Sequence, residues 1–427
     1  MNLSTRASLK NSRAVAAQIL YYCRRHGDRP DRHLEQVVYD RAFITEMVLG
    51  AVRNRYALDW IIDQLVPRTP PDTLYPVLHV GLYQLLVMEH VEPYAAVYET
   101  VEAAGDLCGT AKKPFVNAVL RRALREKEQL LDRLEQQAPA IRYSHPSELI
   151  ERWTRQFGAH ATVQLCKWNN ERPELILRVR PPVSRDQFIE ALSAEGIRAA
   201  PHAREPFVVL LSNRRLEEVP GYAKGWFTVQ DPATLQAVDL LNPQPGERLL
   251  DACAAPGGKT IAMADILSGK GTLVAADLNK LRLKILRANL ARCGQKQVHT
   301  LRLDATDMTP DTFGEDLFDG VLLDVPCSNT GVIRRRPDAR MRLNPTRLQS
   351  LLDLQSQLLD RAATLLRPGG RLVYSTCSLE REENEEQITH YLERHPSFQW
   401  EAEIRTFPPR DRVDGIYAAR LRLRAHS

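Results

Sequence analysis

The sequence predicts a multidomain chain in which an all-α helical bundle comes first, a small α+β domain follows, and an α/β domain completes it. Apolar residues recur at three- and four-residue spacing over residues 1–140, with no strand pattern. From about residue 226, short apolar strands alternate with helical segments, which is typical of a mostly parallel sheet with helices on both faces. We therefore expect domains at 1–140, 141–225 and 226–427.

The overall composition excludes some classes of protein. No apolar run approaches the ~20 residues of a membrane helix, and the mean hydropathy is −0.34. The first residues contain no apolar core of the signal-peptide kind. We expect a cytoplasmic monomer. A formal charge of +5 permits a polyanionic partner but does not require one.

The cysteines argue against a disulfide framework and against a metal site. They are seven in number and widely spaced, and no CxxC occurs. This usage fits a reducing compartment. We expect no bound metal, and most of the thiols should be small buried groups.

The N-terminal bundle should contain several amphipathic helices. Their apolar residues lie within 12–25, 35–66, 72–91 and 115–137, and polar breaks such as HGDRPDRH separate them. The last of these segments becomes strongly charged towards its end. A helical bundle is the fold that this pattern favours.

The middle region mixes helices and strands. Helices are expected at 145–158 and 186–196, and strands at 175–180 and 206–212. This pattern predicts a small α+β unit.

The α/β domain follows a regular alternation. Strands are expected in ERLLDAC, GTLVAADL, HTLRLDAT, FDGVLLDVPC and GRLVYSTC. Helices are expected in KTIAMADIL, in KLRLKILRANLARCG and in the long amphipathic segment 343–370, which closes with Pro-Gly-Gly. Open sheets of this kind bind ligands at the carboxyl ends of their strands.

Three of these strand ends indicate an adenosine-containing cofactor. The first leads into DACAAPGGKT, where Pro256, Gly257 and Gly258 form a tight turn before a helix, although a purely structural turn would look the same. Asp277, at the second strand end, lies 19 positions after Gly258, where an acid can bind a ribose diol or merely cap a helix. Asp304, at the third strand end, would face an adenine. Because neither GxGxxG nor a P-loop occurs, S-adenosylmethionine is favoured over a dinucleotide.

The fourth strand end, DVPCSNTG, leads into a basic loop. Residues 332–347 contain six arginines and one aspartate, which suits contacts with nucleic-acid phosphates or, equally, a solvated loop. The candidates for RNA contacts are Arg334, Arg335, Arg336 and Arg340.

The fifth strand end is Cys377, and with Cys327 it gives two thiols at neighbouring strand ends, 50 positions apart. A thiolate that adds to carbon 6 of cytosine makes carbon 5 able to accept a methyl group. This chemistry needs a nucleophilic thiol, a carboxyl group and a proton-transfer group. Asp324, Cys327 and Cys377 are of those types, although two buried structural cysteines are the alternative.

Five glutamates follow Cys377 closely, and acids near a thiol oppose its ionisation. We expect them to begin a helix between Ser378 and Glu382, where they complement its positive end. In that position they need not point at the thiol.

Together these motifs resemble a known family. DACAAPGGKT, AADLN, DAT, DVPCSNTG, YSTCSLEREENE and DGIYAARLR are similar to motifs of the Nol/NOP/Sun-type RNA 5-methylcytosine methyltransferases, and segments of the first 125 residues resemble NusB-like RNA-binding domains. The resemblance implies a Rossmann-like catalytic domain. It further implies S-adenosylmethionine-dependent methylation of carbon 5 of one cytosine in small-subunit (16S) ribosomal RNA, presented unpaired or flipped out.

The resemblance also implies individual roles. Cys377 would be the nucleophile, Cys327 would assist release of the adduct, and Asp324 would be the acid near ring nitrogen 3 and would also face the cofactor. The remaining cofactor contacts would be Cys253, Ala254, Ala255, Pro256, Gly257, Gly258, Lys259, Asp277 and Asp304. The chain departs from the family pattern at Asn329, where Gly is frequent, and in RRRPDARMR.

Two other functions fit parts of the pattern. The NusB-like half would suit an RNA-binding assembly or antitermination factor with a non-catalytic methyltransferase-like domain. A methyltransferase acting on an amino group is the third possibility, but DVPCS lacks the aromatic residue expected after the fourth strand.

Overall fold

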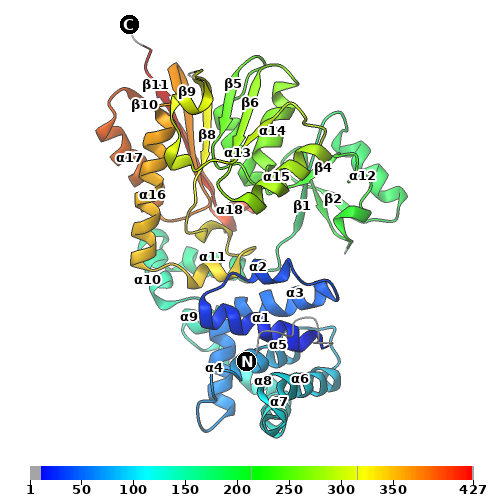
Figure 1. Cartoon of the computed structure of the whole chain (residues 1–427). Coiled ribbons are helices and arrows are strands. Elements are labelled where there is room, and N and C mark those ends of the chain that lie inside the picture. The colour runs from blue at the N-terminus through cyan, green and yellow to red at the C-terminus, as the bar shows by residue number, and fades with distance from the viewer. Residues whose placement is uncertain (1–10, 213, 315, 426–427) are drawn as a thin grey trace. The chain divides into compact units, whose positions relative to one another are not determined.

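A computed structural model describes residues 11–212, 214–314 and 316–425, and the chain folds into two compact units (Figure 1). The first unit comprises Met1–Glu171 and Ile333–Leu343, and the second comprises Arg172–Val332 and Asn344–Ser427. Residues 1–10, which fall within the segment expected to lack a signal-peptide core, lie outside the described residues. No described helix is long and apolar enough to cross a bilayer.

The first unit is helical, which confirms the predicted bundle. Its helices are α1 (Ser12–His26), α2 (Pro30–Leu34), α3 (Arg41–Arg53), α4 (Arg55–Leu65), α5 (Tyr75–Leu86), α6 (Pro93–Cys108), α7 (Lys113–Arg125), α8 (Lys127–Glu135), α9 (Pro139–Arg142), α10 (Ser147–Phe157) and α11 (Ala159–Asn170). Helix α5 is buried on all sides at the centre of the core. The segment 115–137 forms two helices, because the backbone at Glu126 leaves the helical region (φ −101°, ψ 14°).

The second unit begins with a four-stranded sheet. Its strands are β1 (Leu175–Val179), β2 (Ala199–Pro201), β3 (Phe207–Leu210) and β4 (Phe227–Val229), in the order β2-β3-β1-β4 and antiparallel throughout. Helix α12 (Arg185–Ala194) begins with a capping box at Ser184 and packs Phe188 and Leu192 against the sheet. The predicted α+β fold is confirmed, with β2 and β4 as short strands that the pattern did not indicate. The helix expected at 145–158 belongs to the first unit, as α10.

The larger sheet of this unit has seven strands in the order β10-β11-β9-β8-β5-β6-β7. The strands β5 to β9 are parallel, and β10 and β11 complete the sheet as antiparallel strands. The bounds are β5 (Arg248–Asp251), β6 (Thr272–Ala276), β7 (His299–Leu301), β8 (Phe318–Asp324), β9 (Leu366–Thr376), β10 (Phe398–Arg405) and β11 (Tyr417–Leu423). The predicted mostly parallel sheet is confirmed.

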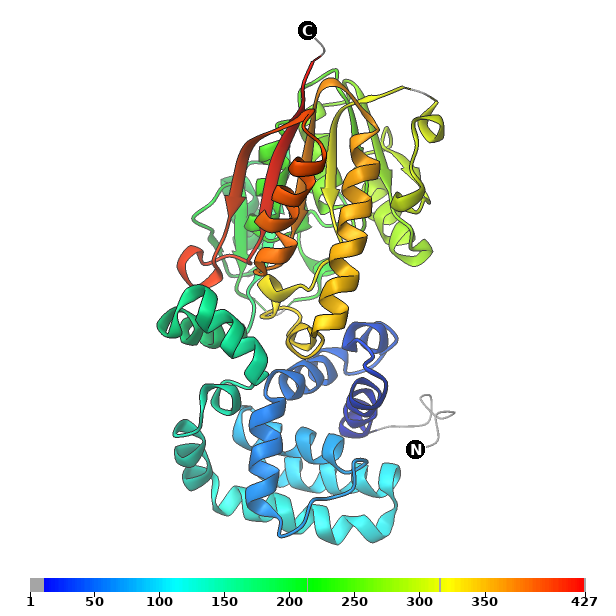
Figure 2. The ribbon, with the colours of Figure 1, turned by 90° about the vertical axis from the view of Figure 1, so that its left-hand side faces the viewer.

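Helices cover both faces of the seven-stranded sheet. One face packs Leu249, Leu322 and Val373 against α13 (Pro232–Leu241), α14 (Gly258–Leu267) and α15 (Lys280–Arg292). The other face packs against α16 (Pro345–Ala363) and α17 (Glu385–Arg394), which lie side by side in Figure 2. A short helix, α18 (Pro408–Asp411), precedes β11.

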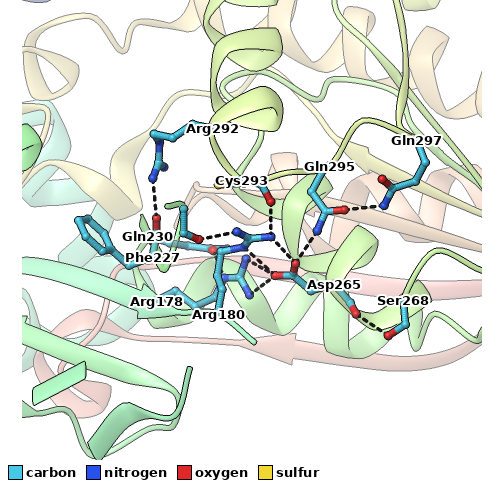
Figure 3. A network of polar contacts seen from close by, with 11 residues as sticks. Arg178, Arg180, Phe227, Gln230, Asp265, Ser268, Arg292, Cys293, Gln295 and Gln297 are labelled. Atoms are coloured by element: carbon cyan, nitrogen blue, oxygen red, sulfur yellow. Dashed lines mark hydrogen bonds and ion pairs between the residues drawn. The ribbon is translucent and has the colours of Figure 1, made fainter. Parts of the chain in front are cut away.

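A buried ion-pair network attaches the small sheet to α14 (Figure 3). The Arg178 and Arg180 guanidiniums donate to the Asp265 carboxylate at 2.6–3.2 Å, and both arginines are 4% exposed. Gln295 donates to the same carboxylate at 2.7 Å, and Arg178 also donates to Gln230 at 2.8 Å. Because a buried charge is costly unless it is paired, Asp265 holds both arginines in place.

We predict that Asp265→Asn destabilises the second unit by about 3–5 kcal/mol, because two buried guanidiniums lose their shared carboxylate. Pulse proteolysis in urea, with fragments of this unit read by mass spectrometry, measures the change. Asp360→Asn is the control, because Asp360 is 38% exposed and pairs with Arg394 at the surface; it should cost about 1 kcal/mol or less. Equal losses in the two variants would contradict the prediction.

Candidate active site

The predicted site residues of the catalytic region gather at one edge of the seven-stranded sheet. Asp324 is the last residue of β8, Asp277 directly follows β6, and Cys377 directly follows β9. Cys253 and Asp304 lie in the loops after β5 and β7. Because these five strands are parallel, their carboxyl ends meet at one edge, as expected for a ligand site.

The loop after β5 allows close approach of a ligand to the backbone. Gly257 has φ 108°, and a Cβ there would lie 2.6 Å from the Leu286 side chain, so this turn requires glycine. Helix α14 begins at Gly258, which directs the free N–H groups of its first turn towards the loop. Burial, followed by nearby carboxylates including Asp324, raises the pKa of Cys253, so this thiol serves as an apolar wall.

The acids after β6 and β7 have different surroundings. Asp277 is 5% exposed and accepts from the Ala255 N–H at 3.1 Å and from the Asn279 N–H at 2.9 Å. A carboxylate has about four acceptor sites, so Asp277 retains capacity for a diol. Asp304 accepts from the N–H and the hydroxyl of Thr306, and these hydrogen bonds lower the pKa of Asp304.

Asp324 is held from two sides. Lys259 Nζ lies 2.7 Å from Asp324 Oδ2, and the Ser375 hydroxyl donates to Asp324 Oδ1 at 3.1 Å. Burial alone would lower the pKa of Lys259, but the Asp324 carboxylate, with Asp251 and Cys377, raises it. Lys259 and Asp324 thus form an ion pair at the end of β8.

The two cysteines are adjacent in space. Cys327 Sγ lies 3.2 Å from Cys377 Sγ, and both are free thiols. Cys377 Sγ also lies 3.2 Å from Asn329 Oδ1, and the Cys377 N–H donates to Cys327 Sγ at 3.3 Å. The hydrogen bond with Cys377, burial and the charge of Glu383 raise the pKa of Cys327 well above that of an ordinary thiol. Cys327 therefore keeps its proton at neutral pH.

The glutamates after Cys377 are not all directed away from the site, which corrects the expectation from the sequence. The chain first forms a 3₁₀ turn, Arg381–Glu383, and α17 begins only at Glu385. Glu380 and Glu383 are fully buried. The charge of Glu383 reaches Cys327, so this acid does influence one of the two thiols.

Glu383 joins the loops that carry the cysteines. Its carboxylate accepts from the Ser328 N–H at 2.9 Å, from the Ser328 hydroxyl and from the Ser378 hydroxyl at 2.5 Å. Gln355 of α16 donates to it at 2.9 Å. Ser328 follows Cys327 and Ser378 follows Cys377, so one buried carboxylate fixes both neighbours of the thiols.

Asn329 and Ser375 also lie at the site, although neither was predicted to be a site residue. Asn329 has φ 64°, a conformation that favours glycine and that asparagine tolerates, which accounts for Asn at a position where the family often has Gly. The Ser-Asn-Thr-Gly run after Cys327 is a turn signal that could have indicated this conformation. Nothing in the sequence shows that Ser375 faces Asp324.

The basic loop differs from what we expected. Arg340 is fully buried in the first unit and donates to the carbonyls of Arg53 at 3.0 Å and Ser144 at 2.8 Å. Arg334 is 6% exposed and stacks on Trp168 at 4.2 Å. In this conformation both guanidiniums pack within the first unit, so each would have to leave these contacts to meet RNA. Arg335 is half-buried, and Arg336 is exposed.

Comparisons with known proteins agree with this geometry. The family "16S rRNA methyltransferase RsmB/F" matches residues 238–422, the NusB family matches 10–125, and an RsmF/B-like ferredoxin-like domain matches 145–215. Ribosomal RNA small subunit methyltransferase B of Yersinia pestis is 39% identical over 84% of this chain and 83% of its own length. The chain belongs to the ribosomal RNA small subunit methyltransferase B family.

Other relatives support this membership. The probable ribosomal RNA small subunit methyltransferase B of Synechocystis is 36% identical over 91% of this chain and 88% of its own. The crystal structure of PH0851 superposes with a TM-score of 0.79 at 27% identity, covering 96% of this chain and 98% of that one. The Nol/NOP/Sun-type and NusB-like resemblances seen in the sequence are confirmed at the level of the family.

S-adenosylmethionine is the cofactor of the ribosomal RNA small subunit methyltransferase B family, as the strand ends predicted. The residues present fit it: the glycine turn admits a close ligand, Asp277 retains acceptor sites for a ribose diol, and Asp304 lies at the next strand end. When bound, this cofactor supplies an electrophilic methyl group on a sulfonium. Within the described residues, no group of three His, Cys, Asp or Glu side chains could hold a metal ion.

We predict that Glu383→Gln destabilises the second unit by about 2 kcal/mol or more, because a neutral amide cannot accept all the hydrogen bonds that the carboxylate receives. Methyl transfer should fall in the same variant as the cysteine loops separate. Glu386→Gln is the control, because Glu386 is 43% exposed in the first turn of α17. Urea pulse proteolysis and a methyl-transfer assay measure both effects. Indistinguishable behaviour of the two variants would contradict the role given to Glu383.

A second prediction concerns Asp251, whose pKa burial raises to about 7. Its Oδ2 accepts from Thr260 at 2.7 Å, and its buried Oδ1 has no hydrogen-bond partner among the described residues. The stability that Asp251 contributes is therefore fully present below its unfolded pKa of about 3.9 and is lost as the pH rises to about 7. The free energy of unfolding of wild type minus that of Asp251→Asn should fall across this window, and a flat difference would contradict the assignment.

Proposed function

We propose that this protein methylates carbon 5 of a specific cytosine in small-subunit (16S) ribosomal RNA through a covalent adduct between Cys377 and carbon 6. The observation that carries the proposal is the pair of free thiols 3.2 Å apart at the ligand-binding edge of the sheet, beside Asp324. Membership of the family supports ribosomal RNA as the substrate.

In the first step, the Cys377 sulfur forms a bond to carbon 6 of the cytosine. Electron density moves towards ring nitrogen 3, and an acid there stabilises it. We assign this contact to Asp324, which would pass to ring nitrogen 3 the proton that the Cys377 thiol gives up on bonding to carbon 6. The Lys259 ammonium, 2.7 Å away, would stabilise the Asp324 carboxylate after that transfer. Carbon 5 then has enamine character and takes the methyl group.

The adduct must then be released. Carbon 5 loses its proton, the carbon 5–carbon 6 double bond reforms, and the Cys377–carbon 6 bond breaks. A group beside the Cys377 sulfur must take part in this proton transfer, and Cys327 is adjacent. Cys327 keeps its proton in the free site, so it would have to give that proton up to the solvent before it could accept the proton that carbon 5 loses.

Other parts of the chain have supporting roles in this proposal. The domains 1–140, 141–225 and 226–427 would bind RNA, support the catalytic domain and carry out the transfer, respectively. Of the basic loop, Arg335 and Arg336 remain as candidate RNA contacts. The target base must be unpaired or flipped out, because carbon 6 is shielded within a stack. We propose a monomer in the cytoplasm.

We predict that Cys327→Ala accumulates a covalent protein–RNA adduct, because addition to carbon 6 proceeds while release is impaired. Cys377→Ala should abolish methyl transfer and form no adduct. Denaturing gels with radiolabelled ribosomal RNA and transfer of tritiated methyl groups measure the two outcomes. Methylation that survives in Cys377→Ala would exclude Cys377 as the nucleophile. An intact wild type that transfers no methyl group would instead favour a non-catalytic RNA-binding factor.

A further inference from the structure

A polar groove of about 510 Å³ lies on the second unit, outside the site described above. Its walls come from the turn between β2 and β3, from α13, from the end of β10 and from α18. Its polar and charged lining residues include His202, Arg204, Gln236, Arg405, Arg410 and Asp411. The groove thus lies between the small sheet and the last loop of the catalytic sheet.

Three arginines line the groove, and each of them pairs with at least one nearby carboxylate. Arg410 is 69% exposed and pairs with its neighbour Asp411 at 2.8 Å. Arg405 is 46% exposed, and its partners Glu385 and Glu403 lie at 3.3 and 3.7 Å.

Arg204 is the most firmly held of the three arginines, because it donates hydrogen bonds to the Pro232 carbonyl at 3.1 Å and to the Asp239 carboxylate. Exposed ion pairs of the kind that Arg405 and Arg410 make contribute about 0–1 kcal/mol each. Because a guanidinium has five N–H donors, a phosphate can bind these exposed arginines alongside their carboxylate partners.

The strand register shows that the groove lies near Cys377, the proposed nucleophile. Arg405 of β10 is opposite Tyr417 of β11, and Tyr417 is opposite Thr376 of β9. Cys377 is the next residue after Thr376. Because neighbouring strands are about 4.8 Å apart, the Arg405 backbone lies roughly 10 Å from that of Thr376, at the same edge of the sheet.

We propose that this groove, which we name the strand groove (His202, Arg204, Arg405 and Arg410), binds backbone phosphates of the single-stranded RNA segment that flanks the target nucleotide. The inference rests on the proposed function and specifies where its substrate is held. A base that leaves its stack requires that the adjoining strand be held near the active site. The forked arginine guanidinium matches the geometry of a phosphate.

The lining residues also indicate which part of an RNA strand the groove contacts. No aromatic ring other than the His202 imidazole is among its lining residues in the described parts of the chain, so stacking of successive bases is not its main contact. Contacts with phosphates position a strand without reading its sequence. The strand groove should therefore increase affinity and orient the RNA, while the identity of the target base is read elsewhere.

The test uses the full chain with Arg405→Gln/Arg410→Gln. Fluorescence anisotropy with a fluorescein-labelled single-stranded RNA measures Kd over a series of salt concentrations. We expect Kd to rise about tenfold, and the slope of log Kd against log salt to fall by about 1.4, since each phosphate contact on a single strand contributes about 0.7. The Kd for S-adenosylmethionine should not change.

Arg394→Gln is the matched control. Arg394 is 47% exposed and pairs with Asp360 at 3.1 Å, as Arg405 pairs with glutamates. It is the last residue of α17, four positions before β10 begins at Phe398, whereas Arg405 is at the other end of that strand. This variant should bind RNA as the wild type does.

The outcomes separate this inference from the proposed function. If the double variant binds RNA as Arg394→Gln does, with the wild-type salt slope, the strand groove is not the RNA site. Methylation of cytosine by the wild type would still support the proposed function in that case. If the wild type binds RNA through these arginines but methylates no cytosine, the proposed function fails and the groove assignment stands.

Discussion

The candidate active site depends on one buried carboxylate, that of Glu383. Parallel strands such as β8 and β9 bring their ends to the same edge, but the loops beyond them are free to diverge. A fully buried carboxylate must receive hydrogen bonds, and Glu383 receives them from Ser328, Ser378 and Gln355. The two serines therefore cannot separate without leaving a buried charge unpaired. This constraint keeps the adjoining thiols within 3.2 Å of each other.

The small sheet stabilises the same site from a greater distance. Asp265 lies on α14, the helix that begins at Gly258 of the cofactor loop, and it pairs with two arginines of the small-sheet region. Gln230 accepts from Arg178 at 2.8 Å and lies next to Gly258, so the network reaches the loop directly. The α+β region is thus part of the scaffold that orders the cofactor loop, in addition to any contact it makes with RNA.

Much of this arrangement could be predicted because it depends on local pattern. Helical periodicity predicted the bundle, and the β–α alternation placed Asp277, Asp324 and Cys377 at one edge of a sheet. The antiparallel strands β10 and β11 were not predicted, because β10 has polar, partly exposed residues of the edge-strand kind. The burial of Arg340 and Glu383 could not be predicted either. Both side chains meet their partners through long-range folding, and charged residues are almost always exposed.

The central claim is that Cys377, and not its neighbour Cys327, bonds to carbon 6 of the substrate. The most direct measurement uses ribosomal RNA in which 5-fluorocytidine replaces cytidine, because fluorine at carbon 5 cannot leave as a proton does and the adduct persists. After incubation of the wild-type protein with this RNA and S-adenosylmethionine, nuclease and protease digestion followed by mass spectrometry locates the modified residue. The account predicts a methylated nucleotide on the peptide that contains Cys377. A nucleotide on Cys327, or no adduct under conditions in which normal RNA is methylated, would contradict it.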